Sequence, residues 1–260
     1  MSHISYSELK TWVECAWKHK LNYIERISPF KGNEYTAFGT ALHTVCENLV
    51  LEKEVNFKTL FQEEFLNNLT ILKKGDPDLQ FKVDLISQMR VQGDQIIEHI
   101  LPALKQHFGD FKLIEVEEKL FEDIEEKDYN FKGFIDLVIQ TKDEKYHIID
   151  WKTCSWGWDS RKKSDKMITY QLTLYKHFWC IKHNVDPISV QTHFALLKRT
   201  AKNNLVEIFK VSTGAKKTEN ALKLLNKAIY NIKRKSHIKN KLSCHGRYGT
   251  CEFYKTEHCP

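Results

Sequence analysis

The sequence lacks three features that would assign it to common classes of protein. None of its apolar runs approaches the roughly 20 residues that a membrane-spanning helix needs. Its first twenty residues carry charges and contain no apolar signal-peptide core, so secretion is not expected. A Gly-x-x-x-x-Gly-Lys-Ser/Thr phosphate-binding loop is also missing, which excludes an ATPase motor of that kind. We therefore expect a cytoplasmic protein (in the host cytoplasm if it is viral) with no membrane partner.

The composition is that of an ordinary globular protein, with 42% hydrophobic and 28% charged residues. A chain of 260 residues is long enough for one large domain with a substantial core. The net charge of +6 is unevenly distributed, because 22 of the 40 Lys and Arg residues but only 7 of the 34 Asp and Glu residues lie from Trp151 onward. A basic half suits a polyanion such as nucleic acid, although a Lys-rich surface is also common in proteins that bind none.

Residues 130–153 predict an antiparallel hairpin, because two β-branched and aromatic runs are joined by a polar Thr-Lys-Asp-Glu-Lys turn. The two-residue alternation places Asp136 on one face of the first strand, and Asp150 with Lys152 on one face of the second. A carboxylate in an apolar strand is costly to bury unless its charge is compensated. Asp136 and Asp150 can meet across the hairpin beside Lys152. Two like charges there need a cation, and a hard divalent ion with oxygen ligands is the natural one.

Helical periodicity occurs in five stretches, namely residues 5–23, a helix opened by Gly39-Thr40, residues 57–108 with a break at Gly75-Asp76-Pro77, residues 165–183 and residues 215–235. In the second helix, His43 and Glu47 lie four residues apart and share one face. A lone histidine on a helix is usually a satisfied core or surface group. In the fourth helix, Gln171 and Tyr175 share a face in the same way. Taken by itself, Cys15 in the first helix is interpreted as a small buried residue.

Three further strands are predicted, over residues 112–121, 188–197 and 205–211. The first contains acids whose alternation with apolar residues is imperfect. Glu117 in this strand could lie near the metal ions, and the alternative is an ordinary solvated strand face.

The loop at residues 155–163 combines indole rings with cations, which are Trp156, Trp158, Arg161, Lys162 and Lys163. Indole rings stack on unpaired bases, and the cations can pair with phosphates. Core tryptophans are the alternative, but the surrounding charges disfavour deep burial of both rings. We expect this loop to contact DNA.

Three of the seven cysteines, Cys244, Cys251 and Cys259, lie within the last seventeen residues. In a reducing compartment this concentration indicates metal ligands rather than disulfides. Cys15 can supply a fourth thiolate if the two ends of the chain meet. Four thiolates suit structural zinc as well as an iron–sulfur cluster, and His245 or His258 could replace one of them.

In their order along the chain, these elements resemble the PD-(D/E)xK nuclease superfamily, in its RecB-like exonuclease branch. The elements that carry the resemblance are the opening helix with Cys15, Gly39-x-x-x-His43, Gly133-x-x-Asp136, Asp150-x-Lys152, Gln171-x-x-x-Tyr175 and the terminal cysteines. The resemblance implies an α/β fold, with a restriction-endonuclease-like mixed central sheet flanked by helices. It also implies a single nuclease domain over residues 1–260. In that domain a helical insertion occupies about 55–108, and a Cys-rich tail at about 240–260 packs with the N-terminal helix.

The same resemblance implies a Mg²⁺- or Mn²⁺-dependent DNA exonuclease that acts on single strands or DNA ends. Its implied metal ligands are His43, Asp136, Asp150 and the backbone carbonyl of Trp151. Glu47 would support these ligands without binding the metal itself. Lys152 would position the attacking water, and Gln171 and Tyr175 would maintain the geometry of the site.

The terminal cysteines and Cys15 resemble the ligands of a [4Fe–4S] cluster, which we expect ahead of zinc. Relatives in this branch serve in CRISPR spacer acquisition and in bacteriophage DNA metabolism, so a helicase, recombination or CRISPR protein is an expected partner. The alternative is a non-catalytic nucleic-acid-binding subunit whose metal is only structural.

Overall fold

The computed structural model of the protein describes residues 2–27, 29–124, 128–246 and 249–260, and the chain divides into two compact units. Unit 1 comprises Met1–Phe30, Leu120–Gly133 and Gly214–Pro260, and unit 2 comprises Lys31–Lys119 and Phe134–Thr213. Strands β2 (Phe111–Ile124) and β3 (Tyr129–Thr141), which pair with each other, are both divided between the units. Among the described residues, no helix is both long enough and apolar enough to span a membrane.

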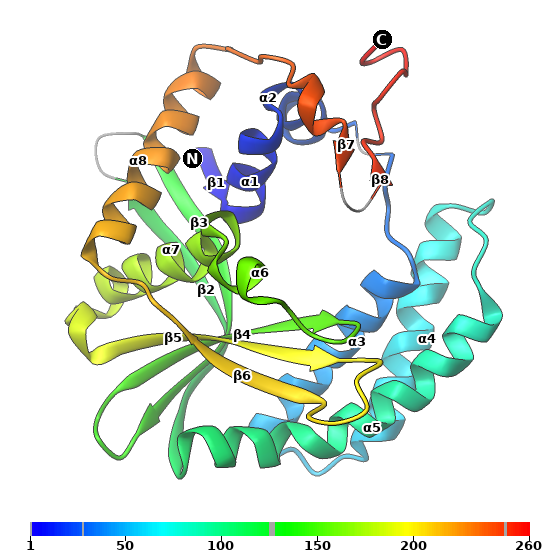
Figure 1. The fold of residues 1–260 in the computed structure, drawn as a ribbon, viewed down its shortest axis with the longest axis vertical. Helices are drawn as coiled ribbons and strands as arrows, with labels where there is room; N and C mark the ends of the chain where they lie inside the picture. The colour runs from blue at the N-terminus through cyan, green and yellow to red at the C-terminus, as the bar shows by residue number, and fades with distance from the viewer. Residues whose placement is uncertain (1, 28, 125–127, 247–248) are drawn as a thin grey trace. The chain divides into compact units, whose positions relative to one another are not determined.

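Unit 2 contains a mixed sheet with the strand order β3-β4-β5-β6 (Figure 1). Pairing is antiparallel between β3 and β4, parallel between β4 and β5, and antiparallel between β5 and β6. The remaining strands of this unit are β4 (Tyr146–Cys154), β5 (Val190–Lys198) and β6 (Val206–Val211). Its helices are α3 (Glu34–Val50), α4 (Phe57–Gly75), α5 (Val83–Phe108), α6 (Ser160–Ser164), α7 (Lys166–His183) and the 3₁₀ turn η2 (Pro187–Ser189).

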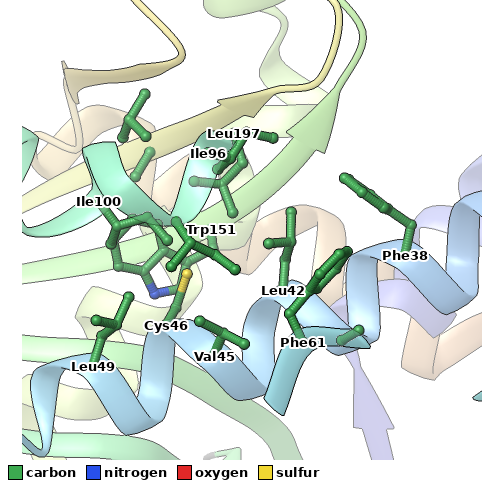
Figure 2. Packing of buried hydrophobic residues seen from close by; sticks show 14 of the residues in the cluster. Phe38, Leu42, Val45, Cys46, Leu49, Phe61, Ile96, Ile100, Trp151 and Leu197 are labelled. Carbon is green, nitrogen blue, oxygen red and sulfur yellow. The ribbon is translucent and has the colours of Figure 1, made fainter. Parts of the chain in front are cut away.

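The main core of unit 2 lies between one face of this sheet and helices α3, α4 and α5, as Figure 2 shows in part. Apolar residues recur along α3 at steps of three and four, which gives the helix one continuous buried face. The residues labelled in Figure 2 are Phe38, Leu42, Val45, Cys46, Leu49, Phe61, Ile96, Ile100, Trp151 and Leu197. Because side chains alternate along β4, the inward position of Trp151 turns its neighbours Asp150 and Lys152 to the opposite face, where α7 packs.

Unit 1 contains β1 (Ser2–Ser5), which pairs in parallel with the first residues of β3 from Ser2–Tyr129 to Ser5–Lys132. Its other elements are α1 (Tyr6–Glu14), α2 (Ala16–His19), the π-helix η1 (Lys20–Ile24), α8 (Ala215–Lys233), the 3₁₀ turn η3 (Lys241–Ser243), and the small hairpin of β7 (His245–Gly246) and β8 (Gly249–Thr250). In Figure 1, α8 (orange) lies against α1 (blue).

Most predicted elements are confirmed, including the mixed sheet flanked by helices, the central hairpin and the helical stretch broken after Gly75. Two helix boundaries were wrong. The first helix is interrupted at Cys15, whose extended backbone (φ −162°, ψ 115°) separates α1 from α2. Helix α3 begins at Glu34 rather than Gly39, because Asn33 and Thr36 form a reciprocal capping box that starts the helix earlier.

The predicted loop at residues 155–163 was also partly wrong, because its second half belongs to the short helix α6. The Asp159 side chain accepts a hydrogen bond from the Lys162 backbone N–H at 2.7 Å and so caps this helix.

Candidate active site

Two carboxylates lie where the central hairpin stops pairing. The β3–β4 register runs from Gln140–Tyr146 to Leu137–Ile149. One position further, Asp136 and Asp150 fall on the same face, as the alternation predicted. There the backbone N–H of Trp151 donates to Oδ2 of Asp136 at 2.7 Å. The Asp136 carboxylate therefore serves as an acceptor for β4 just beyond the last paired residues.

Helix α3 brings His43 to the same point. A Cβ atom placed on Gly39 would lie 3.2 Å from Oγ1 of Thr153, so glycine allows α3 to approach β4 closely. His43 follows one helical turn later on the same face, and its Nδ1 lies 3.7 Å from Oδ2 of Asp136. The Gly-x-x-x-His spacing thus positions the imidazole by a close helix–strand contact.

Glu117 of β2 completes a group of possible metal ligands with His43 and Asp136. Each of the three offers a ligand atom, and these atoms lie within 4.8 Å of one another. Glu117 has a φ of 51°, in the left-handed region that a residue with a side chain rarely adopts. Strain of this kind is often found at functional sites. The only trace of this role in the sequence is the imperfect alternation of the strand.

Asp150 is not a member of that ligand group, although the sequence placed it with His43 and Asp136. Its carboxylate is only 2% exposed and has two neighbours. Nε2 of Gln171 donates to Oδ1 at 2.8 Å, and Nζ of Lys152 lies 2.5 Å from Oδ2. Each carboxylate oxygen has two lone pairs, so Oδ2 retains one that the Lys152 ammonium does not use.

Helix α7 supports Asp150 through the predicted Gln-x-x-x-Tyr pair. Nε2 of Gln171 also lies 3.3 Å from the Tyr175 hydroxyl, and Tyr175 hydrogen-bonds the backbone of Phe134. Burial raises the pKa of Tyr175, so the phenol remains protonated at neutral pH. The helix thereby connects the Asp150 side chain to β3.

The electrostatics of the site fit a divalent cation. Burial, and then the charge of Asp150, raises the pKa of Asp136 well above its usual range. The pKa of Glu117 is raised by burial, Glu47 and Asp150. Burial lowers the pKa of Lys152, but Asp150 and Asp136 raise it by more. The carboxylates oppose each other's ionisation, and an imidazole and a carboxylate lone pair lie beside them. Together these groups form a donor set suited to Mg²⁺ or Mn²⁺.

The predicted DNA-contacting residues differ in how available they are. Trp156 is 75% exposed, and Arg161 is exposed as well. Trp158 packs against Phe194 with ring centroids 5.1 Å apart. Its other neighbours include Phe209 and the Lys162 ammonium, while Lys163 is ion-paired with Glu207. Only the first indole therefore has a ring that is open for stacking.

In unit 1, the cysteine-rich tail contacts the N-terminal helices. The Asn240 backbone N–H donates to Sγ of Cys15 at 3.3 Å, and Nε1 of Trp17 donates to the His258 carbonyl at 2.9 Å. Within the tail, the Cys251 N–H donates to the Cys244 carbonyl at 2.8 Å. The predicted ligands Cys15, Cys244, Cys251 and Cys259 thus all belong to this unit. Among the described residues, however, no three cysteine sulfurs lie within 4.8 Å of one another.

Comparison with known proteins supports an assignment by family. A family model described as the PD-(D/E)XK nuclease superfamily matches residues 3–259, and no curated protein sequence matches the chain. A crystal structure of a "Putative exonuclease" from Eubacterium rectale is 11% identical with a TM-score of 0.58, and the match covers 98% of this chain and 86% of that one. This likeness shows a shared fold. A structure named SSO0001 is 14% identical over 74% of this chain and 84% of that one, but its TM-score of 0.36 supports no argument. Since the family model spans nearly the whole sequence, the chain belongs to the PD-(D/E)XK nuclease superfamily.

Proposed function

We propose that this protein is a metal-dependent DNA exonuclease that hydrolyses phosphodiester bonds in single strands or at DNA ends. The observation that carries the proposal is the grouping of His43, Glu117 and Asp136 within 4.8 Å, at the point where β3 and β4 separate. Lys152 and Asp150 lie on the adjoining stretch of β4. Membership of the superfamily supports the nuclease activity in general.

The residues that would hold Mg²⁺ or Mn²⁺ are His43, Glu117 and Asp136, with Asp150 and the Trp151 carbonyl beside them. A bound divalent ion lowers the pKa of a water molecule and offsets charge on the scissile phosphate. The Trp151 N–H holds Oδ2 of Asp136, which limits the rotation of that carboxylate. Glu47 lies close enough to raise the pKa of Glu117 and so stabilises its protonated form when the site is empty.

Lys152 positions the attacking water. Its side chain is 31% exposed, so the ammonium can donate to a water molecule or a phosphate oxygen while it remains beside Asp150. Gln171 holds the other oxygen of Asp150, and Tyr175 links that glutamine to the Phe134 backbone. No side chain forms a covalent bond to the substrate. The exposed Trp156 ring and the Arg161 guanidinium are the best placed groups of their loop for stacking on a base and pairing with a phosphate.

Cys15 and the three tail cysteines are proposed to hold a [4Fe–4S] cluster that ties the two ends of the chain together. Four thiols in one unit fit such a cluster by donor type. Four thiolates also suit structural zinc, which is the alternative occupant of this site.

The proposal is tested with end-labelled linear DNA, single- and double-stranded, and with circular single-stranded DNA. Wild-type protein should degrade the linear DNA in Mn²⁺ or Mg²⁺, should not act in EDTA, and should leave circles intact. Lys152→Ala, Asp136→Asn and Glu117→Gln should each lower turnover by about 10²-fold or more, as removal of a group that stabilises developing charge does. Glu115→Gln is the matched control, because Glu115 is an exposed acid on the same strand.

Cleavage of circles would make the enzyme an endonuclease. DNA binding without degradation in either metal would instead favour the non-catalytic subunit. Wild-type turnover by Lys152→Ala would rule out the role given to that residue.

A further inference from the structure

Helix α8 and the segment after it carry a concentration of positive charge. Residues 214–260 contain 11 Lys and Arg residues but only 3 Asp and Glu residues. The exposed cations of this stretch include Lys216, Lys223, Lys227, Arg234, Lys235 and Lys241. None of them belongs to the candidate active site, which lies in unit 2. This exposed cationic face is called the α8 surface below.

The apolar face of α8 is already used within unit 1. Ala221, Leu225, Ala228 and Ile229 are fully buried, and the helix packs against α1 (Figure 1). A basic amphipathic helix that binds a lipid bilayer inserts its apolar face. Since that face of α8 is occupied, only the cationic face is free for a partner. Its charge requires that the partner be anionic.

Three of these side chains have no ion-pair partner for their ammonium group among the described residues, namely Lys227, Lys235 and Lys241. In contrast, Lys216 and Lys223 share Glu219, at 2.8 and 2.5 Å. Exposed ammonium groups without nearby carboxylates attract an extended polyanion and release its counterions. They add little to the stability of the fold, so they can be changed without disturbing it.

An aromatic group lies among the cations. Tyr230 is 57% exposed, and the guanidinium of Arg234 lies 5.3 Å from the centre of its ring. Nη1 of Arg234 also donates to the Tyr230 hydroxyl at 2.6 Å. A flat aromatic and guanidinium surface between cations suits the sugars, bases and phosphates of nucleic acid better than the carboxylates of an acidic protein.

We infer that the α8 surface binds the sugar–phosphate backbone of nucleic acid independently of its sequence. The 19 residues of α8 make a helix about 28 Å long, which is most of one turn of B-DNA at about 34 Å. The surface therefore contacts several successive phosphates. This inference rests on the proposed function only in naming DNA as the polymer.

The test measures DNA binding apart from cleavage. A full-length Lys152→Ala background is titrated with labelled random-sequence duplex and single-stranded DNA in buffers of rising salt without divalent ions. In this background, Lys227→Glu, Lys235→Glu and Lys241→Glu are combined. A matched control combines Lys53→Glu, Lys74→Glu and Lys105→Glu, which reverse three exposed lysines of unit 2 and give the same net charge. Circular dichroism verifies that both triple variants are folded.

Each phosphate contact contributes about 0.9 to the slope of log affinity against log salt for duplex DNA, so three lost contacts should reduce the slope by about 2.7. The same relation gives a loss of roughly 10²-fold in affinity at about 0.15 M salt. The control should retain nearly the parental slope. Equal slopes for the two triple variants would overturn the inference, as would lysine-dependent binding to phosphatidylserine vesicles with unchanged DNA binding. If the surface binds DNA but the wild-type protein cleaves none, the inference stands and the proposed nuclease function fails.

Discussion

Acidification should destabilise unit 2 through a pair of buried histidines at β4 and β5. Nδ1 of His147 lies 3.1 Å from Nε2 of His193, and the two residues are only 7% and 2% exposed. Oγ1 of Thr141 lies 3.0 Å from the other ring nitrogen of His147. A single hydrogen between the two imidazoles satisfies both facing nitrogens, whereas a proton on each would place two donors against one another.

The size of the effect follows from the pKa values of the pair. Burial lowers the pKa of His147 to about 4, a result to which His107, Lys210 and Lys145 contribute and which Asp143 opposes. The pKa of His193 is lowered to about 3 by burial, with His147, His107 and Lys210 adding to the effect. Both rings therefore bind a proton more weakly in the folded than in the unfolded protein, where the pKa is about 6.5.

The stability contributed by the pair is therefore complete above about pH 6.5 and is lost as the pH falls toward 4. Because the two titrations are coupled, the pair is expected to take up one proton in this pH range. The difference between the unfolded pKa of about 6.5 and the folded pKa of about 4 then corresponds to roughly 3 kcal/mol of unfolding free energy.

Urea unfolding between pH 7 and pH 4, followed by hydrogen exchange in β4 and β5, measures this loss. For a slope near 3 kcal/mol/M, the midpoint should fall by about 1 M through this pair alone. His147→Asn combined with His193→Gln keeps an amide near each facing nitrogen without a titrating group, so the double variant should lose less stability. His99→Gln, at an exposed position of α5, is the control and should follow the wild type. A parallel loss of stability in the double variant and the wild type would show that this histidine pair does not cause the acid sensitivity.

Two further predictions concern the candidate active site and the cysteines. Gly39→Ala should lower turnover by roughly tenfold in steady-state assays, because the new Cβ pushes α3 away from Thr153 and displaces His43. Adding Thr153→Ala should restore activity. Full activity in the single variant would show that Gly39 is not needed to position His43. Anaerobically purified protein should be brown with about four iron atoms per chain. Cys251→Ser should reduce this iron content, whereas Cys180→Ser, at a buried cysteine of unit 2, should leave it unchanged. A colourless protein with one zinc would exclude the cluster.

The parts of the site that could be predicted from the sequence are those governed by local periodicity. Strand alternation, together with the short polar turn between the two strands, predicts that Asp136 and Asp150 lie on one face of the hairpin, and the register agrees. The four-residue helical repeat likewise places Gln171 and Tyr175 on one face of α7, where they hydrogen-bond. These relations depend on neighbours within one element or one hairpin.

The features that were missed depend on contacts between distant segments or on local backbone exceptions. The packing of Trp158 on Phe194 requires knowledge that β5 lies beside that loop. The ion pair that occupies Asp150 cannot be inferred from Asp-x-Lys, because the spacing does not fix the rotamers. The start of α3 was a local signal that was overlooked, since the cap residue and its partner stand three apart in the sequence.

Glu117 illustrates how a residue can be brought into a site against its own backbone preference. Its left-handed conformation costs about 1–2 kcal/mol for an L-residue. The next residue, Glu118, is buried and accepts hydrogen bonds from Nε1 of Trp179 at 2.7 Å, Nζ of Lys182 at 2.8 Å and Nε2 of His183 at 2.6 Å. A buried hydrogen bond to a charged group contributes about 1.5–3 kcal/mol, so the bond from Trp179 alone is comparable to the strain at Glu117. The attachment of Glu118 to α7 therefore holds β2 in a conformation that an isolated strand would avoid, and the side chain of Glu117 is kept beside His43 and Asp136 as a consequence.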